Sequence, residues 1–421
     1  MRITVVDSDV SYPASSGKRL RTLNLLLPLA RRHDITYIGR GCGSKDDSRA
    51  FEFLSDHGLR PILVNEPLAA KNNLAFYGRL AANAVSPYPY SVGSHMTPRL
   101  REAVARHAAA APIDVLQLEY LAYLYTAQGL KVPTIVQAHN IEASLWRRHF
   151  EIEQSPLKRA YIKEQWRKFI RFERDAFHRV DRVVCCSRAD AALAAELYGD
   201  VATSVVDNGV DVARFAAVSP DFAAKKILFL GALDWRPNLD AVAMLLGEIF
   251  PAVRAKLPAA ELLIVGRHPP DQLRKRIAVS PGVTLHSDVP DVIPYLAQCA
   301  VMTVPLRIGG GSRLKILESL AAGLPVVSTT IGAEGLELED GRHLLLADTP
   351  DEQAHALARA LDDPQPFFAR AEAGRTQVAA RYDWAMLADR LEAVWQGVAL
   401  QRKNARQVRP GLDAAAAHVP G

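Results

Sequence analysis

The sequence has little that would mark a disulfide-linked, metal-binding or membrane-spanning protein. It has four cysteines in 421 residues with no metal-ligand spacing, and the adjacent pair Cys185 and Cys186 cannot bridge without severe strain. No histidine cluster suits a divalent ion. No apolar run approaches the roughly 18 residues that cross a bilayer, and the N-terminus opens with a strand-like run instead of a cationic leader. These absences predict a cytoplasmic protein without a bound metal.

What the chain does contain is typical of a large globular protein. It is 49% hydrophobic and 23% charged, and its length is too great for one ordinary core. The net charge of +5 permits attraction to nucleic acid, anionic lipid or phosphorylated substrates without choosing between them. Composition therefore predicts two domains and leaves the partner open.

Short β-branched runs alternate with longer helical patterns, and this rhythm occurs twice. Continuous apolar strands separated by helices predict a parallel sheet covered on both faces. The first series consists of RITVVD, DITYIG, PILVN, DVLQLE, PTIVQA, RVVCCS and TSVVDNG. The second consists of KKILFLG, ELLIVG, GVTLHS, AVMTVP, LPVVST and HLLLAD. Two such series predict two doubly wound α/β domains.

The turn-rich stretch from Asp207 to Asp211 separates the two series, so we place the domain junction there. This predicts an N-terminal domain over residues 1–207 and a C-terminal domain over residues 208–382. An amphipathic helix over residues 383–400 is expected to strap the domains. Residues 401–421 have too little apolar content to pack and are predicted to be disordered.

The strongest local signal is the segment from Pro305 to Thr329, in which a strand, a glycine-rich loop and a helix follow one another. The three glycines are Gly309, Gly310 and Gly311, and the helix is expected from about Ser312 to Ala322. Glycines let backbone amides approach a ligand closely, and a helix N-terminus attracts anions. The segment therefore predicts a diphosphate site.

Two cations at the start of that helix favour the same interpretation. Arg313 and Lys315 run against the helix dipole, which a bound phosphate would explain. The alternative is that both point to solvent. Glu318 follows one turn after Lys315 and could bind the two hydroxyls of a ribose, or the two residues could form only a surface ion pair.

The N-terminal half offers two weaker candidates, each at the carboxyl end of an expected strand. The loop ending at Gly17 opens a helix carrying Lys18 and Arg19, which favours anions, although a flexible surface loop fits this segment equally well. His139 follows PTIVQA and could donate to a substrate oxygen. A lone histidine is more often structural, so the functional interpretation of His139 depends on the neighbouring candidate sites.

Residues 146–182 form a basic and aromatic stretch. Such a stretch could lie on an anionic membrane or bind nucleic acid. Its interspersed glutamates and near-helical aromatic spacing favour an ordinary packed helix over either.

Several ordered motifs resemble the retaining glycosyltransferases of family four. They are GGGSRLKILESLAAGLPVVST, AHNIE, VVCCS and VDNGVDVARF, and the resemblance covers the chain from Met1 to about Leu400. It implies the GT-B fold, with two facing Rossmann-like domains, an interdomain cleft, and a UDP- or GDP-sugar as co-substrate held mainly by the C-terminal domain. It implies that Glu318 holds the ribose, that Gly17 lies beside the donor phosphates and that His139 lies near the donor sugar.

The sequence departs from the family pattern at three positions. The first glutamate of the E-x7-E motif is Gly310, and the usual arginine and lysine after the first strand of the C-terminal domain are Ala232 and Pro237. We infer that Arg313 and Lys315, with the glycine amides of residues 309–311, supply the missing charge, and Arg236 is a further candidate or is simply solvated.

The resemblance implies transfer of a sugar to a hydroxyl acceptor with retention, and we expect His139, Arg313 and Lys315 to share catalysis without a metal. The acceptor is expected to be a glycan or a lipid-linked intermediate, with peripheral contact at the inner membrane face. Two alternatives stay open: a sugar-nucleotide epimerase, and a catalytically silent protein that binds the donor. Nucleic-acid binding rests on basicity alone and ranks last.

Overall fold

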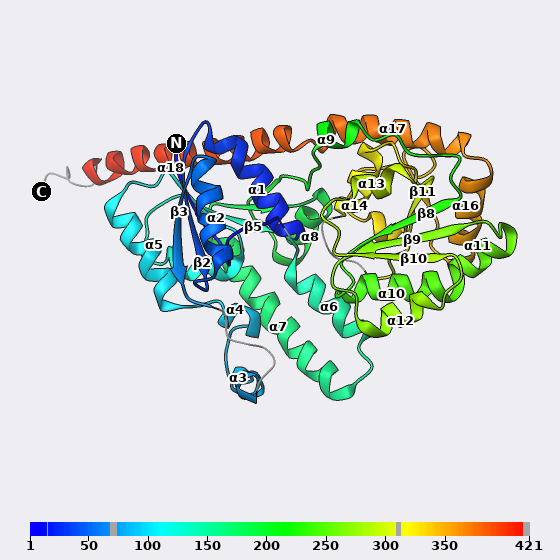
Figure 1. Cartoon of the computed structure of the whole chain (residues 1–421). Helices are drawn as coiled ribbons and strands as arrows, with labels where there is room; N and C mark the ends of the chain where they lie inside the picture. Colours follow the sequence, from blue (N-terminus) through cyan, green and yellow to red (C-terminus); the bar gives the residue numbers. More distant parts are fainter. Residues whose placement is uncertain (15, 68–73, 309–312, 416–421) are drawn as a thin grey trace, which may run out of the picture. The chain divides into compact units, whose positions relative to one another are not determined.

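The computed structural model describes residues 1–14, 16–67, 74–308 and 313–415, and these form two compact units (Figure 1). Unit 1 comprises Met1–Asp207 together with Leu387–Gly421, and unit 2 comprises Asn208–Met386. Each unit contains one parallel sheet with helices in the connections. The prediction of two doubly wound parallel-sheet domains is confirmed.

In the described residues, the sheet of unit 1 has seven strands in the order β3-β2-β1-β4-β5-β6-β7. Every pairing is parallel, and the apolar runs seen in the sequence form the strands. The strands β1, β2, β4, β5 and β6 are largely buried, whereas β3 and β7 are partly exposed. The strands are β1 Arg2–Val6, β2 Asp34–Gly41, β3 Leu59–Asn65, β4 Val115–Leu118, β5 Thr134–Ala138, β6 Arg182–Cys185 and β7 Thr203–Val205. The helices are α1 Gly17–Ala30, α2 Lys45–Asp56, α3 Leu74–Asn83, α4 Tyr90–Gly93, α5 Pro98–Ala110, η1 Leu121–Ala127, α6 Glu142–Ile152, α7 Pro156–Arg179, α8 Arg188–Tyr198 and most of α18 Trp384–Ala415.

The described part of unit 2 has six strands in the order β10-β9-β8-β11-β12-β13, again all parallel. They are β8 Lys226–Leu230, β9 Glu261–Gly266, β10 Val283–Ser287, β11 Val301–Val304, β12 Val326–Ser328 and β13 Leu345–Leu346. The helices are α9 Val212–Ala216, α10 Arg236–Met244, η2 Leu245–Ile249, α11 Phe250–Lys256, α12 Asp271–Ala278, α13 Ile293–Ala297, α14 Leu314–Ala321, α15 Thr330–Ala333, α16 Pro350–Asp362 and α17 Gln365–Arg381.

Local sequence explains where many of these helices begin. Ser16 accepts a hydrogen bond from the Arg19 amide and caps α1. Ser44 before α2 and Thr349 before α16 each form a reciprocal capping box with the acidic residue three positions on. Each sheet packs within its own cluster of buried apolar side chains, one in unit 1 and one in unit 2.

The helix α18 is longer than the sequence predicts. It continues past Leu400 to Ala415. Polar contacts hold the first residues beyond Leu400: Arg402 Nε donates to Asp181 Oδ1 at 2.8 Å, and Arg182 Nη2 donates to Gln401 Oε1 at 3.3 Å. None of the helices in the residues that the structure describes has both the length and the apolar character needed to span a membrane.

Candidate functional site

Both sheets have a point where the strand order reverses, and in open α/β sheets ligands bind at the carboxyl ends of the strands there. The reversal lies between β1 and β4 in unit 1 and between β8 and β11 in unit 2. Asp7 and Glu119 directly follow the first pair of strands, and Gly231 and Pro305 directly follow the second pair. The topology therefore favours a ligand site at these loops and at the helices that start beside them.

In unit 1 the side chain of Glu119 is the centre of a buried polar cluster. It accepts a hydrogen bond from Thr22 Oγ1 of α1 at 2.7 Å and one from Gln117 Nε2 at 2.6 Å. His139 Nε2 lies 3.6 Å from Glu119 Oε2, an ion-pair distance that is too long for a hydrogen bond. Glu119 is 2% exposed, so its charge depends on these partners.

This cluster favours a charged imidazole. Burial would lower the pKa of His139, but contacts with Cys186 and Glu119 outweigh it and raise that pKa to about 9. Burial would likewise raise the pKa of Glu119, but His139, with help from Lys18 and Thr22, lowers it to about 2. His139 is therefore a half-buried cation at neutral pH, held by a carboxylate that sequence reasoning did not identify.

Hydrogen bonds to the Asp7 carboxylate hold the loop after β1 in place. Asp7 is fully buried and accepts hydrogen bonds from Lys18 Nζ, from Tyr37 Oη at 2.5 Å and from Ser11 Oγ at 3.0 Å. Gly17 is the first residue of α1, directly before Lys18. Because Thr22 of the same helix contacts Glu119, Gly17 belongs to the helix that lies against the end of β4.

The Asp7-Ser8-Asp9 triplet has the Asp-x-Asp pattern that can mark a metal site. Arg19 Nη2 binds Asp9 Oδ2 at 2.5 Å, and Lys18 binds Asp7. Both carboxylates thus already have cationic partners. Across the described residues, no group of three or more His, Cys, Asp or Glu side chains is placed to hold a metal ion.

In unit 2, Lys315 in the first turn of α14 faces the start of α10. Its Nζ donates to Asn238 Oδ1 at 3.0 Å and lies 4.9 Å from the centre of the Phe229 ring. Asn238 is 3% exposed, and its Nδ2 donates to the Ala232 carbonyl at 2.9 Å, which fixes the amide so that its oxygen faces Lys315. A Cβ at Gly231 would come within 2.7 Å of that amide, so only glycine allows the contact.

Lys315 and Glu318 are both half-buried but do not form the surface ion pair considered above, since no ion pair joins them in the part of the chain described. Burial and the charge of Arg313 lower the pKa of Lys315 to about 7, against the opposing effect of Glu318. Burial raises the pKa of Glu318 to about 7, although Arg214 and Lys315 oppose it. Two titratable groups with pKa values shifted to neutrality on one helix are typical of a functional site.

Arg313 differs from its predicted position. The helix begins at Leu314, and Arg313 is the preceding residue in a left-handed conformation with φ 53°. Its side chain is 7% exposed, and its Nη2 lies 3.2 Å from Glu334 Oε2, which excludes the solvated alternative for this cation. Gly309, Gly310 and Gly311 lie outside the described residues, and Arg236 is exposed.

The basic stretch of residues 146–182 is largely a packed pair of helices, as the sequence favoured. Trp146 of α6 stacks on Phe169 of α7 at 5.8 Å, and Phe169 is fully buried. Lys168 is buried too and donates to the Asn83 carbonyl at 2.6 Å. The aromatic residues Trp146 and Phe169 therefore support the fold of unit 1.

Comparison with known families matches both units of the chain. Residues 20–214 match Glycosyltransferase Family 4, and residues 224–363 match Glycosyl transferases group 1. A glycogen synthase of Mycobacterium tuberculosis is 27% identical over 300 residues, which cover 68% of this chain and 67% of that protein. A phosphatidyl-myo-inositol mannosyltransferase of the same species is 32% identical over 206 residues, which cover 46% of this chain and 54% of the relative. The matched region thus spans about half the length of the mannosyltransferase.

Solved structures share the architecture of this chain. The crystal structure of Anabaena HepE in complex with UDP and glucose has a TM-score of 0.67 at 15% sequence identity and covers 94% of this chain and 99% of its own. At this identity the likeness shows the fold alone. Together with the two parallel sheets, it confirms the GT-B fold that the sequence resemblance implied.

Proposed function

Because this chain belongs to the group 1 glycosyl transferases of glycosyltransferase family 4, we propose that it moves a sugar from a UDP- or GDP-sugar to a hydroxyl of a glycan or lipid-linked acceptor with retention of configuration. The acceptor would be met at the inner face of a membrane. The solved relative with bound UDP supports a nucleotide-sugar donor. The observation that carries the proposal is the half-buried pair Lys315 and Glu318 at the start of α14.

In this mechanism Lys315 neutralises the diphosphate as it leaves. One of its three N–H donors is bound by Asn238, and the described residues supply it no further acceptor, so the ammonium can still bind phosphate oxygens. Asn238 follows Pro237, where the family pattern has a lysine. Lys315 thus places a cation at the turn where the lysine of the family pattern is missing. We propose that Lys315 takes over the role of that lysine.

The remaining residues have complementary roles in the proposal. Arg313 adds a second positive charge at the start of α14, and Glu318 accepts hydrogen bonds from the ribose hydroxyls. Gly17 and the glycines 309–311 let backbone amides approach the phosphates. His139, as a cation, binds an oxygen of the donor sugar and stabilises charge as the glycosidic bond breaks, and no metal is required.

A donor screen tests the proposal. Thermal unfolding with UDP-, GDP- and ADP-sugars should identify one donor that raises Tm, because a ligand at 100 times its Kd stabilises the folded state by about 2.7 kcal/mol. Glu318→Ala should weaken binding of that donor by about 10- to 100-fold, the loss expected for charge-assisted hydrogen bonds. Glu261→Ala, an exposed carboxylate at the start of β9, is the matched control and should bind as the wild type does.

Product analysis then separates the possible activities. Nucleoside diphosphate released only when an acceptor is present indicates transfer. Release without an acceptor would indicate an epimerase or hydrolase, and donor binding without any turnover would indicate a silent binding protein. If Glu318→Ala binds the donor with wild-type affinity, Glu318 does not bind the ribose and this part of the proposal is wrong.

The pH dependence of donor binding should be bell-shaped, with its maximum near pH 7. The donor binds charged Lys315 and ionised Glu318, whose pKa values are both about 7 in the free protein. Above pH 7 binding must add a proton to Lys315, and below pH 7 it must remove one from Glu318, so affinity falls by up to about tenfold per pH unit on each side. Isothermal titration calorimetry from pH 5 to 9 measures both limbs of the profile, because this pH range extends to either side of the pKa values of Lys315 and Glu318.

The two limbs can be assigned by substitution. Lys315→Ala should lose the fall in affinity above neutrality, and Glu318→Ala should lose the fall below it. A nucleotide sugar has no terminal phosphate that titrates near neutrality, so the limbs report the protein. A flat profile in the wild type would mean that neither residue binds the donor.

A further inference from the structure

Unit 1 contains a buried arginine whose hydrogen-bond acceptors are all neutral. Arg40 is the penultimate residue of β2, near the carboxyl end of the strand, and is 4% exposed. Its Nε donates to the Ser8 carbonyl at 3.1 Å. Its Nη2 donates to His95 Nδ1 at 2.9 Å and to Tyr123 Oη at 3.2 Å. Because a guanidinium only donates, Nδ1 is the acceptor and the His95 ring is neutral. In the described residues Arg40 Nη1 has no hydrogen-bond partner.

The buried guanidinium keeps its charge, because arginine is not deprotonated in proteins. Three ion pairs lie at the same edge of the sheet: Lys18 with Asp7, Arg19 with Asp9, and His139 with Glu119. Arg40 has no acidic partner in the part of the chain that the structure describes. Buried charges are normally paired, since an unpaired one strongly disfavours the folded state. Arg40 is therefore suited to an anion from outside the chain.

The polar groups around Arg40 extend toward the surface of unit 1. Ser8 and His95 are half-buried, and so is Tyr120, whose ring packs edge-on against His95 with ring centres 5.5 Å apart. Ser91 lies on α4 one turn before His95, and its buried Oγ makes no hydrogen bond in the described residues. We call this group the Arg40 cluster: Ser8, Arg40, Ser91, His95, Tyr120 and Tyr123. Nearly all buried polar groups are hydrogen-bonded in proteins, so two unsatisfied groups in one cluster mark a place where a polar ligand can bind.

We propose that the Arg40 cluster binds an anionic group, a phosphate or a carboxylate, on the acceptor of the sugar. The planar guanidinium matches the oxygens of either group, and hydrogen bonds between opposite charges are the strongest of their kind. The N–H groups of Nη1 are the donors that the protein leaves unused. This role rests on the proposed transfer reaction and adds to it the chemical class of the acceptor.

The sheet places the Arg40 guanidinium at the same edge as His139 but apart from it. The strand order is β3-β2-β1-β4-β5, with all strands parallel. The guanidinium contacts Ser8, which closely follows β1, and His139 directly follows β5. Adjacent strands lie about 4.8 Å apart, so two spacings separate the guanidinium from His139 by about 10 Å. An anion on Arg40 is therefore a different part of the substrate from the donor sugar near His139, which favours the acceptor.

Binding of inorganic phosphate to the full chain tests the role of Arg40. The parent protein is Lys315→Ala, which lacks the cation proposed for the donor phosphates. Isothermal titration calorimetry should show that Arg40→Gln in this parent weakens phosphate binding by about tenfold or more. Arg40→Lys keeps the charge but loses the planar fork, so its loss should be smaller.

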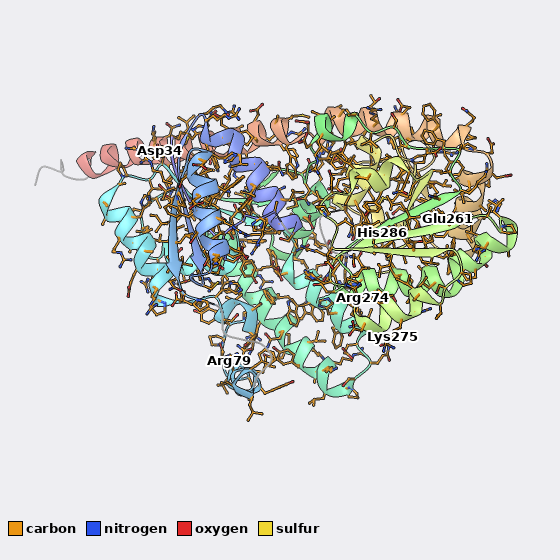
Figure 2. The ribbon with its side chains drawn as sticks, in the orientation of Figure 1. Asp34, Arg79, Glu261, Arg274, Lys275 and His286 are labelled. Atoms are coloured by element: carbon orange, nitrogen blue, oxygen red, sulfur yellow. The ribbon has the colours of Figure 1, made fainter. Side chains whose placement is uncertain are left out.

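A matched control is an exposed arginine on the neighbouring strand. Arg60 of β3 pairs with Asp34 at 3.2 Å, and Figure 2 labels Asp34, the first residue of β2, at the other end of that strand from Arg40. Arg60→Gln in the same parent should bind phosphate as the parent does. Equal losses in Arg60→Gln and Arg40→Gln would mean that phosphate responds only to the net charge, and this would overturn the proposal.

Competition identifies the anionic group on the acceptor. Glycerol phosphate, glyceric acid and glycerol share a carbon skeleton and carry a phosphate, a carboxylate and no charge. Displacement of inorganic phosphate by one or both of the anions, but not by glycerol, is the expected result, and the stronger competitor names the group. Displacement by neither anion would mean that only an inorganic ion binds, and the proposal would be wrong.

Stability measurements separate a binding role from a structural one. Because its charge is unpaired, Arg40→Gln should keep its Tm within about 3 °C of the wild type in phosphate-free buffer. Unchanged phosphate affinity in both Arg40→Gln and Arg40→Lys would leave Arg40 with a role in the fold alone. Without the Lys315 substitution, Arg40→Gln should show the same Tm shift with the donor as the wild type. A missing donor shift in the wild type bears on the proposed function, and one missing only in Arg40→Gln would assign Arg40 to the donor instead.

Discussion

Replacing Lys315 with alanine should lower kcat/KM for sugar transfer by about 10²- to 10³-fold, the effect typical of removing one preorganised group that stabilises developing charge. The loss should be mainly in kcat, because negative charge on the diphosphate grows as the sugar leaves. Release of nucleoside diphosphate in the presence of acceptor measures both parameters. If KM rises while kcat is unchanged, Lys315 contributes only to binding of the ground state.

The geometry around Lys315 makes this prediction specific to the ammonium. The Nζ lies between the Asn238 oxygen at 3.0 Å and the face of Phe229. The larger planar guanidinium of arginine does not fit that position in the same way, so Lys315→Arg should not restore the rate. Lys226→Ala, at the opposite end of strand β8 where Lys226 pairs with Glu261 at 3.7 Å, is the control and should keep wild-type activity.

The substitution Lys315→Ala should not lower the free energy of unfolding. Burial and Arg313 lower the pKa of Lys315 to about 7, which means that the folded protein disfavours the charged form. This cost is present below pH 7, where the free protein keeps the lysine charged, and it fades as the pH rises. Removal of Lys315 should therefore leave the free energy of unfolding at pH 6 unchanged or slightly higher. A marked destabilisation would instead assign Lys315 a structural role.

The sequence alone predicted the strands of both sheets, because the pattern that marks a strand is local. Each apolar run in the two series forms a strand, including the short HLLLAD, whose Leu345 and Leu346 are β13. Such runs need only local hydrophobicity and flanking turns to be recognised. Helix ends were less well predicted, because tertiary contacts set them: Arg402 holds α18 beyond Leu400, and α14 begins one residue after Arg313.

The partners of the site residues could not be predicted in the same way, because they lie far apart in the chain. Asn238 and Lys315 are separated by 77 positions and meet only when α10 and α14 pack in unit 2. Glu334 holds Arg313 across 21 positions. Glu119 offered a usable signal, since it is a carboxylate at the carboxyl end of an apolar strand beside the one that precedes His139.

The second large effect is expected at His139. His139→Gln removes the cation at the carboxyl end of β5, and kcat for transfer should fall by about 10²-fold or more. The protein should still bind the donor's nucleotide, because Lys315 and Glu318 lie in unit 2. Rapid-quench measurement of a single turnover separates this chemical loss from binding. Wild-type kcat in His139→Gln would remove this residue from catalysis.

Glu119 should act as a positioning residue that keeps His139 charged. Burial by itself would lower the pKa of His139, and the Glu119 carboxylate 3.6 Å from Nε2 helps raise it to about 9. Activity that needs the imidazolium is complete below that pKa and is lost as the pH rises through it. Glu119→Gln removes the negative charge, so the alkaline limb of the pH profile of kcat should move to lower pH.

A matched substitution distinguishes charge from packing at this position. Thr22→Val keeps the Glu119 charge but removes the 2.7 Å hydrogen bond to Oε2, so the alkaline limb should stay close to its wild-type position. Gln117 and Thr22 can still contact a glutamine at position 119, which preserves most of the buried network. If Glu119→Gln lowered the rate equally at every pH, Glu119 would be important for packing alone, and the charge on His139 would have another source.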